Sequence, residues 1–195
     1  MRAALLAMPN LISYSLHIGE YNIPASYRYF YTSENKYARA FLPVDAPFRL
    51  RRFSCKGLAV NALLVRFLHS QPQITELYLP STPTNFIIKP NVIPRLEIAA
   101  GPDPLVRRLI LGRPVKALEC TNPLGSHELQ GIIKALAKSS SSITTLILPR
   151  LANVPLEDSL TLVASSLPSI ESLAMSEHFT SRGRRDTTEV WVRDI

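Results

Sequence analysis

A short frame of apolar and polar positions recurs along this chain. It reads apolar-x-x-apolar-x-apolar, with a small residue in some of the apolar places. The copies are LISYSL, LRRFSC, ITELYL, LEIAAG, VKALEC, ITTLIL and IESLAM, beginning at residues 11, 50, 74, 96, 115, 143 and 170. The alternation in the second half of the frame is typical of a half-buried strand. We therefore predict a series of short strands, each with one open face.

The spacing of the frame indicates a repeat. Successive copies begin 39, 24, 22, 19, 28 and 27 residues apart, and most of these steps lie in or near the period of leucine-rich repeats, about 20–29 residues. The alternative is a doubly wound sheet, whose buried parallel strands have more continuous apolar runs. The polar residues inside each copy favour an irregular α/β leucine-rich-repeat solenoid of about six or seven repeats, with a curved parallel sheet and outer helices.

Prolines mark both ends of the predicted strands. A proline stands one or two residues before five copies of the frame, at Pro9, Pro72, Pro94, Pro114 and Pro168. Three copies are followed directly by a proline, at Pro80, Pro102 and Pro149. Proline lacks an amide donor and moves the preceding residue toward extended geometry. We therefore expect it to block helix before each strand and to end pairing after it.

Helical patterns occupy several segments between the strands. We predict helices over 59–69, 104–111, 127–138 and 157–167, from apolar residues at helical spacing. Asp103 and Ser126 are the expected N-caps, and Gly112 is the expected stop of the second helix. We therefore interpret the serine run in KSSSSITTLILP as a turn from helix to strand. It is not expected to be a domain boundary.

Four of these segments resemble a known family. GRPVKALEC, MPNLISYSL, LPSIESLAM and SSSSITTLILP resemble the F-box-associated leucine-rich-repeat proteins of mushroom-forming fungi. The resemblance implies a non-enzymatic protein-interaction module, similar to the substrate-recognition half of a ubiquitin-ligase receptor. In that family an F-box helix bundle precedes the repeats, and no segment before residue 20 has its pattern. Binding to the cullin-ligase adaptor is therefore expected only if an F-box is encoded upstream.

We expect one domain over 1–195, with a Tyr-rich insertion at about 20–45 and a basic segment at about 180–195. The insertion lengthens the first step of the repeat and contains SYRYFYTS. It can cover the open end of the solenoid. Its tyrosines and basic residues can instead form a stacking platform for nucleic acid or a peptide. The basic segment precedes EVWV, which we interpret as a closing strand.

Composition narrows the partners and the compartment. The net charge is +7 and the pI about 9.7, which allows an anionic partner, and nucleic-acid binding is the alternative function. The arginine clusters are scattered over different segments. Two cysteines do not make a disulfide framework, and Pro9 interrupts the N-terminal apolar run too early for a secretory signal. We expect reduced thiols and an intracellular protein, cytoplasmic or nuclear, without membrane insertion.

No motif for catalysis, cofactor binding or metal binding stands out. The segment GSHELQG lacks the G-x-S-x-G pattern, and its adjacent Ser126 and His127 are poorly placed for proton transfer. The four histidines are dispersed without the i, i+4 spacing of a metal site. We expect a protein that is not an enzyme.

In a solenoid, the x positions of the frame face the binding surface. Stacked strands should place Arg52, Glu76 and Ile98 side by side, with Ser54, Tyr78, Ala100 and Glu119 in the next column. Tyr and Arg dominate binding hot spots. A protein partner of unknown identity is therefore expected to contact Arg51, Arg52, Glu76, Tyr78, Glu97, Lys116, Glu119 and Thr145.

Overall fold

The computed structural model describes the backbone of residues 2–17, 41–56, 62–80, 88–152, 154–181 and 184–193. The chain divides into two compact units, Met1–Leu96 and Glu97–Ile195. Both units combine parallel strands with helices, so the predicted α/β class is confirmed. In the described ranges, no helix combines the length and the apolar character needed to cross a bilayer.

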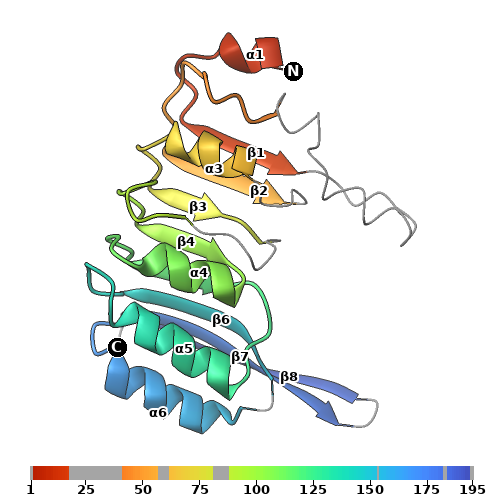
Figure 1. Ribbon diagram of the computed structural model, residues 1–195. Coiled ribbons are helices and arrows are strands. Elements are labelled where there is room, and N and C mark those ends of the chain that lie inside the picture. Colours follow the sequence, from red (N-terminus) through yellow and green to blue (C-terminus); the bar gives the residue numbers. More distant parts are fainter. Residues whose placement is uncertain are drawn as a thin grey trace. The chain divides into compact units, whose positions relative to one another are not determined.

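The first unit is built on three parallel strands. β2 lies between β1 and β3 and pairs with both (Figure 1). The α3 helix buries Leu64, Phe67 and Leu68, and the Phe67 ring lies 5.1 Å from that of Phe53 on β2. The elements are α1 (Arg2–Leu6), β1 (Ser13–His17), β2 (Arg52–Lys56), α3 (Ala62–His69) and β3 (Glu76–Tyr78).

The second unit alternates strands and helices more regularly. Its elements are β4 (Ile98–Gly101), α4 (Asp103–Ile110), β5 (Ala117–Cys120), α5 (Ser126–Leu136), β6 (Thr145–Ala152), α6 (Leu156–Ser166), β7 (Ser172–Ser181) and β8 (Arg184–Arg193). The strands β4 to β7 pair in chain order and in parallel, and the three helices form a row on one side of them (Figure 1). The predicted closing strand is confirmed at β8, which pairs with β7 in antiparallel direction.

Burial follows the frame in both units. In ITTLIL, Ile143, Leu146 and Leu148 are buried, and the residues between them are partly exposed. The same pattern holds in LRRFSC, ITELYL and VKALEC. The apolar positions face the helices and form the core, because a strand sends alternate side chains to opposite faces.

A shared backbone acceptor sets the register of neighbouring strands. The carbonyl of Ile12 accepts hydrogen bonds from the amides of Arg51 and Arg52, at 2.8 and 3.1 Å. The carbonyl of Arg51 does the same for Thr75 and Glu76, at 2.8 and 3.0 Å. In the second unit the same double acceptors are the carbonyls of Glu97, Lys116 and Thr144. One point of the frame therefore aligns each strand on the one before it.

The prolines that precede the strands have a more specific role than expected. The Leu11 amide donates to the Met8 carbonyl at 3.2 Å, which closes a four-residue turn around Pro9. Equivalent bonds close 71–74, 93–96 and 167–170. Proline suits the second position of such a turn, because its fixed φ matches the turn geometry. The turn delivers the chain from the helix side to the next strand.

The prediction that Pro149 ends its strand is wrong. β6 continues to Ala152, with a register shift between Leu148 and Leu151. Proline has no amide to donate, so the ladder is interrupted there and resumes where Leu151 pairs with Glu177.

Both predicted N-caps are displaced by one residue. Asp103 is the first helical residue of α4, after Pro102, and its carboxylate pairs with Arg107 instead of capping the helix. Ser126 is likewise the first residue of α5, after Gly125, whose amide donates to the Glu128 carboxylate at 3.1 Å. The stop at Gly112 is confirmed, since this residue has a φ of 68°, which glycine adopts without strain.

The end of α4 rests on a buried arginine. Arg113 is fully buried, and its Nη1 donates to the carbonyl of Leu109 at 2.9 Å. Burial lowers the pKa of this guanidinium to about 10. Ser139, from the serine run, donates its hydroxyl to the carbonyls of Arg113 and Val115, at 3.3 and 3.1 Å. The serine run therefore connects α5 to β6 within one unit, as predicted.

The alternation within β5 predicts that substitutions at two adjacent residues change the free energy of unfolding by very different amounts. Leu118 is 1% exposed, and its truncation in Leu118→Ala should lower the free energy of unfolding by about 2–5 kcal/mol, because the core cannot fill the cavity. Glu119→Ala, on the open face, should change it by less than about 0.5 kcal/mol. Urea unfolding followed by circular dichroism measures both. Equal losses would contradict the assignment of faces.

Candidate functional site

The open strand face of the first unit brings together Arg52, Glu76, Ser54 and Tyr78. Arg52 lies opposite Glu76, and its Nε donates to Oε1 of that carboxylate at 2.8 Å. Ser54 lies opposite Tyr78, as expected from the frame. The Tyr78 residue is 37% exposed, and the side chains of Arg52 and Glu76 are 66% and 23% exposed. These two columns are therefore accessible to a partner.

The open face of the second unit holds the other predicted residues. Lys116 and Glu97 form an exposed ion pair at 3.3 Å. Glu119 lies opposite Ala100 on one side and Ile147 on the other, and Thr145 lies opposite Ala117. Each unit thus holds four of the eight predicted site residues, although Arg51, Glu97 and Lys116 lie one residue before β2, β4 and β5.

The second face also has an apolar component, of which only Ile98 was among the residues predicted to stack there. Ile98, Ala117 and Ile147 occupy x positions of the frame and remain partly exposed around Glu119. The frame treats these positions as variable and solvated, so it carries no signal for them.

The two faces differ in charge. In the first unit Arg51, Arg52 and Lys56 are exposed and the facing acidic residue is Glu76. In the second unit Glu97, Glu119 and Glu171 accompany Lys116. A partner of one sign would therefore favour one of these faces, because exposed charges act over about a Debye length, roughly 8–10 Å.

The buried polar groups of the second unit do not form a nucleophilic site. Cys120 is completely buried, and burial raises the pKa of its thiol well above the usual range. Burial also raises the pKa of Asp103, although the Arg107 guanidinium opposes this shift. A protonated, inaccessible thiol is a poor nucleophile. The role of these groups is local packing, together with the bond from the Asp103 amide to Oδ1 of Asn122 at 2.7 Å.

In the part of the chain that the structure describes, no three histidine, cysteine or acidic side chains are grouped to hold a metal ion. Both cysteines are buried and neither is part of a disulfide. Residues 18–40, which hold most of the Tyr-rich insertion, lie outside the described part of the chain. The side chains of 177–195 also lie outside it. The nucleic-acid alternative, which depends on these segments, stays a prediction.

Comparisons with known proteins add no relative. No protein-family model matches this chain, and neither the curated proteins nor the solved structures include a match to it. The candidate site is therefore defined by its own residues.

The pair between Arg52 and Glu76 should contribute little to stability. An exposed ion pair is worth about 0–1 kcal/mol. A double-mutant cycle of Arg52→Ala and Glu76→Ala, measured by urea unfolding, should give a coupling free energy below about 1 kcal/mol. Each single variant should remain folded. A coupling above about 2 kcal/mol would mean that the pair holds the strands together.

Asp103 should make stability depend on pH. Its pKa is higher in the folded chain than its ordinary value of 3.8, so the folded state binds more protons in the window just above 3.8. The free energy of unfolding of the wild type should therefore rise, relative to Asp103→Asn, as the pH falls through this window toward 3.8. Glu157→Gln, an exposed change in α6, is the control. A flat difference for Asp103→Asn would contradict the raised pKa.

Proposed function

We propose that this chain is a leucine-rich-repeat protein that recognises a protein partner on the open face of its strands. The proposal rests on one observation above all: side chains of successive strands stand opposite one another at defined frame positions, Arg52 with Glu76 and Ser54 with Tyr78. Such columns form a rigid surface whose side chains vary while the backbone remains regular. Recognition there needs no chemistry of the protein's own.

The alternation of strand and helix in each unit supports the repeat assignment. The frame recurs with buried apolar positions, and the same carbonyl of the frame aligns successive strands, as at Lys116 and Thr144. In a leucine-rich repeat, every copy of the frame forms the same structural unit. The curved solenoid is part of this proposal.

The first unit has the stronger hot-spot composition. Tyr78 offers an exposed aromatic ring. Arg52, on the neighbouring strand opposite Glu76, offers a guanidinium whose position is fixed by its hydrogen bond to Glu76. Arg51 and Lys56 add positive charge at exposed positions. We infer that the partner presents acidic residues around an apolar group, because complementary charge guides association and an aromatic anchor supplies affinity.

The resemblance to F-box-associated repeat proteins suggests the biological context. In that context the chain selects a protein for ubiquitination, and a separate F-box segment binds the ligase adaptor. The strand face proposed here corresponds to the selecting half alone.

A photo-crosslinking residue at position 78 tests the binding face. It should capture a partner from cell extract, whereas the same residue at position 138, beyond the end of α5, should capture none of it. Once the partner is identified, Tyr78→Ala should weaken its affinity about 10- to 100-fold, as a buried aromatic anchor would. Ser15→Ala, an exposed change on β1, is the matched control on the same face.

Two outcomes would contradict the proposal. One is equal capture at positions 78 and 138. The other is an unchanged affinity of the purified partner for Tyr78→Ala and Arg52→Ala, measured by isothermal titration calorimetry with both variants folded by circular dichroism.

A further inference from the structure

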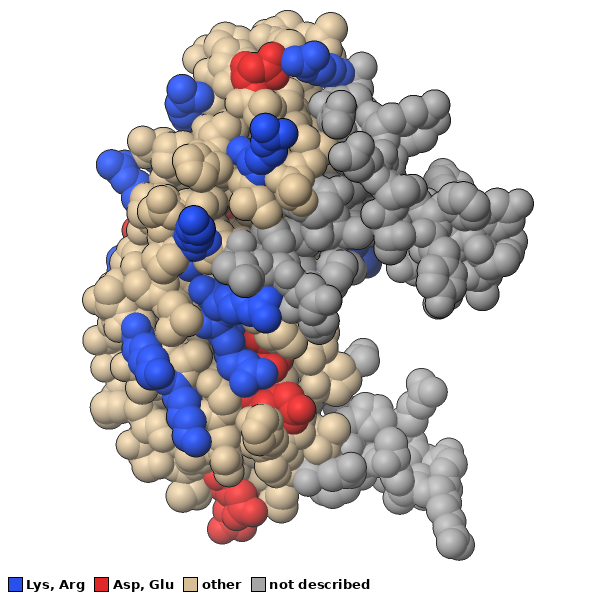
Figure 2. All heavy atoms as spheres, in the orientation of Figure 1, with Lys and Arg blue, Asp and Glu red and all other residues tan. Residues whose placement is uncertain are grey.

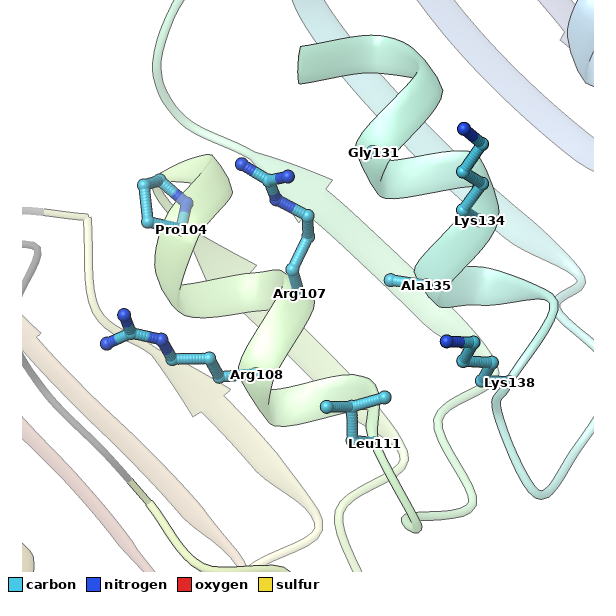
Figure 3. A pocket seen from close by; sticks show the side chains of 8 residues that line it. All are labelled: Pro104, Arg107, Arg108, Leu111, Gly131, Lys134, Ala135 and Lys138. Atoms are coloured by element: carbon cyan, nitrogen blue, oxygen red, sulfur yellow. The ribbon is translucent and has the colours of Figure 1, made fainter. Parts of the chain in front are cut away.

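A shallow, open hollow lies between the helices α4 and α5 of the second unit, on the side of the unit away from the open strand face. Its volume is about 360 Å³, within the size range of pockets for small ligands. Figure 3 shows its walls, which come from both helices. The lining residues are Pro104, Arg107, Arg108, Leu111, Gly131, Lys134, Ala135 and Lys138.

Four basic residues line this hollow, two from each side. Arg107 and Arg108 come from α4, and Lys134 and Lys138 come from α5 and the residues after it. Figure 2 shows that lysine and arginine side chains gather over these two helices. Within the described part of the chain, no carboxylate forms an ion pair with Lys134 or Lys138. Two ammonium groups are therefore available to a ligand.

Arg107 is held in place between the helices. Its guanidinium pairs with the buried Asp103 carboxylate, and it passes close to Gly131 on α5 (Figure 3). A Cβ on Gly131 would lie only 2.3 Å from Nη1 of Arg107. The absence of a side chain at residue 131 therefore makes room for the guanidinium against α5. In the same view the Lys138 ammonium points from the end of α5 toward Leu111, and Arg108 extends from the other side of α4.

We propose that this hollow binds a small anion with more than one phosphate group, of the size of pyrophosphate or tripolyphosphate. A fixed guanidinium presents planar donors that match phosphate oxygens, and flexible lysine ammonium groups add charge from the facing wall. Arg107 and Lys138 come from opposite walls of the hollow, which favours a compact anion over an extended polymer. Pro104, Leu111 and Ala135 supply the apolar part of the walls.

Helix electrostatics offer a competing account of the same cations. Arg107, Arg108 and Lys134 stand in the last turns of their helices, where positive charge stabilises the helix dipole. That account explains the charge. It does not explain the packing of Arg107 against Gly131 or the hollow itself. A substitution that moves the guanidinium without changing any charge separates the two accounts.

Gly131→Ala is that substitution. The added methyl group should push the Arg107 guanidinium away from α5, and the higher helix propensity of alanine should offset the cost of disturbing its pair with Asp103. Calorimetric titration of the whole chain at low ionic strength should show binding of tripolyphosphate and pyrophosphate by the wild type. Gly131→Ala should weaken this affinity about fivefold or more without lowering the melting temperature of the free protein. Lys134→Gln and Lys138→Gln should each weaken it about three- to tenfold.

Lys56→Gln, which removes an exposed charge from β2 in the first unit, is the matched control and should bind like the wild type. The proposal is overturned if the wild type does not bind either anion, or if Gly131→Ala binds as tightly as the wild type. It is also overturned if Lys56→Gln loses as much affinity as Lys134→Gln, because net charge alone would then govern binding. Tighter binding of a single-stranded oligonucleotide, unaffected by Gly131→Ala, would replace it with a nucleic-acid surface. None of these results bears on the strand face.

Discussion

A single backbone acceptor at the start of each parallel junction organises both units. At every parallel junction that the structure describes within a unit, one carbonyl accepts the amides of two consecutive residues on the next strand. A shift of one residue would send the apolar side chains to the open face, because side chains alternate along a strand. The double acceptor therefore fixes the core and, at the same time, the columns in which Arg52 meets Glu76.

The connections position this acceptor. Turns around Pro9, Pro72, Pro94 and Pro168 deliver the chain to the strand at a constant point of the frame. Where this turn is lacking, side chains replace it. At the end of α4, Gly112 reverses the chain and the buried Arg113 satisfies helix carbonyls, and Ser139 then bonds the carbonyl of Arg113 from the following connection. Local polar contacts thus maintain the repeat where its sequence departs from the pattern.

The second unit has two surfaces with different physical properties. Its strand face combines an exposed ion pair with small apolar side chains around Glu119, a mixture suited to another protein surface. Its helix face is hollowed between α4 and α5, and cations line it. The strand face and the helix face consist of different residues. Substitutions can therefore alter one of these surfaces and leave the other unchanged.

The sequence by itself determined the strands, the buried half of each frame and the pairing of Arg52 with Glu76, because these depend on alternation and on a repeated local pattern. It also determined the stop at Gly112, where only the backbone matters. Tertiary structure decided the rest. The ladder continues past Pro149 because β7 supplies pairing partners beyond the proline, where Leu151 pairs with Glu177. The Arg107 guanidinium lies against α5 because Gly131 has no side chain, a relation between distant residues that no local pattern encodes.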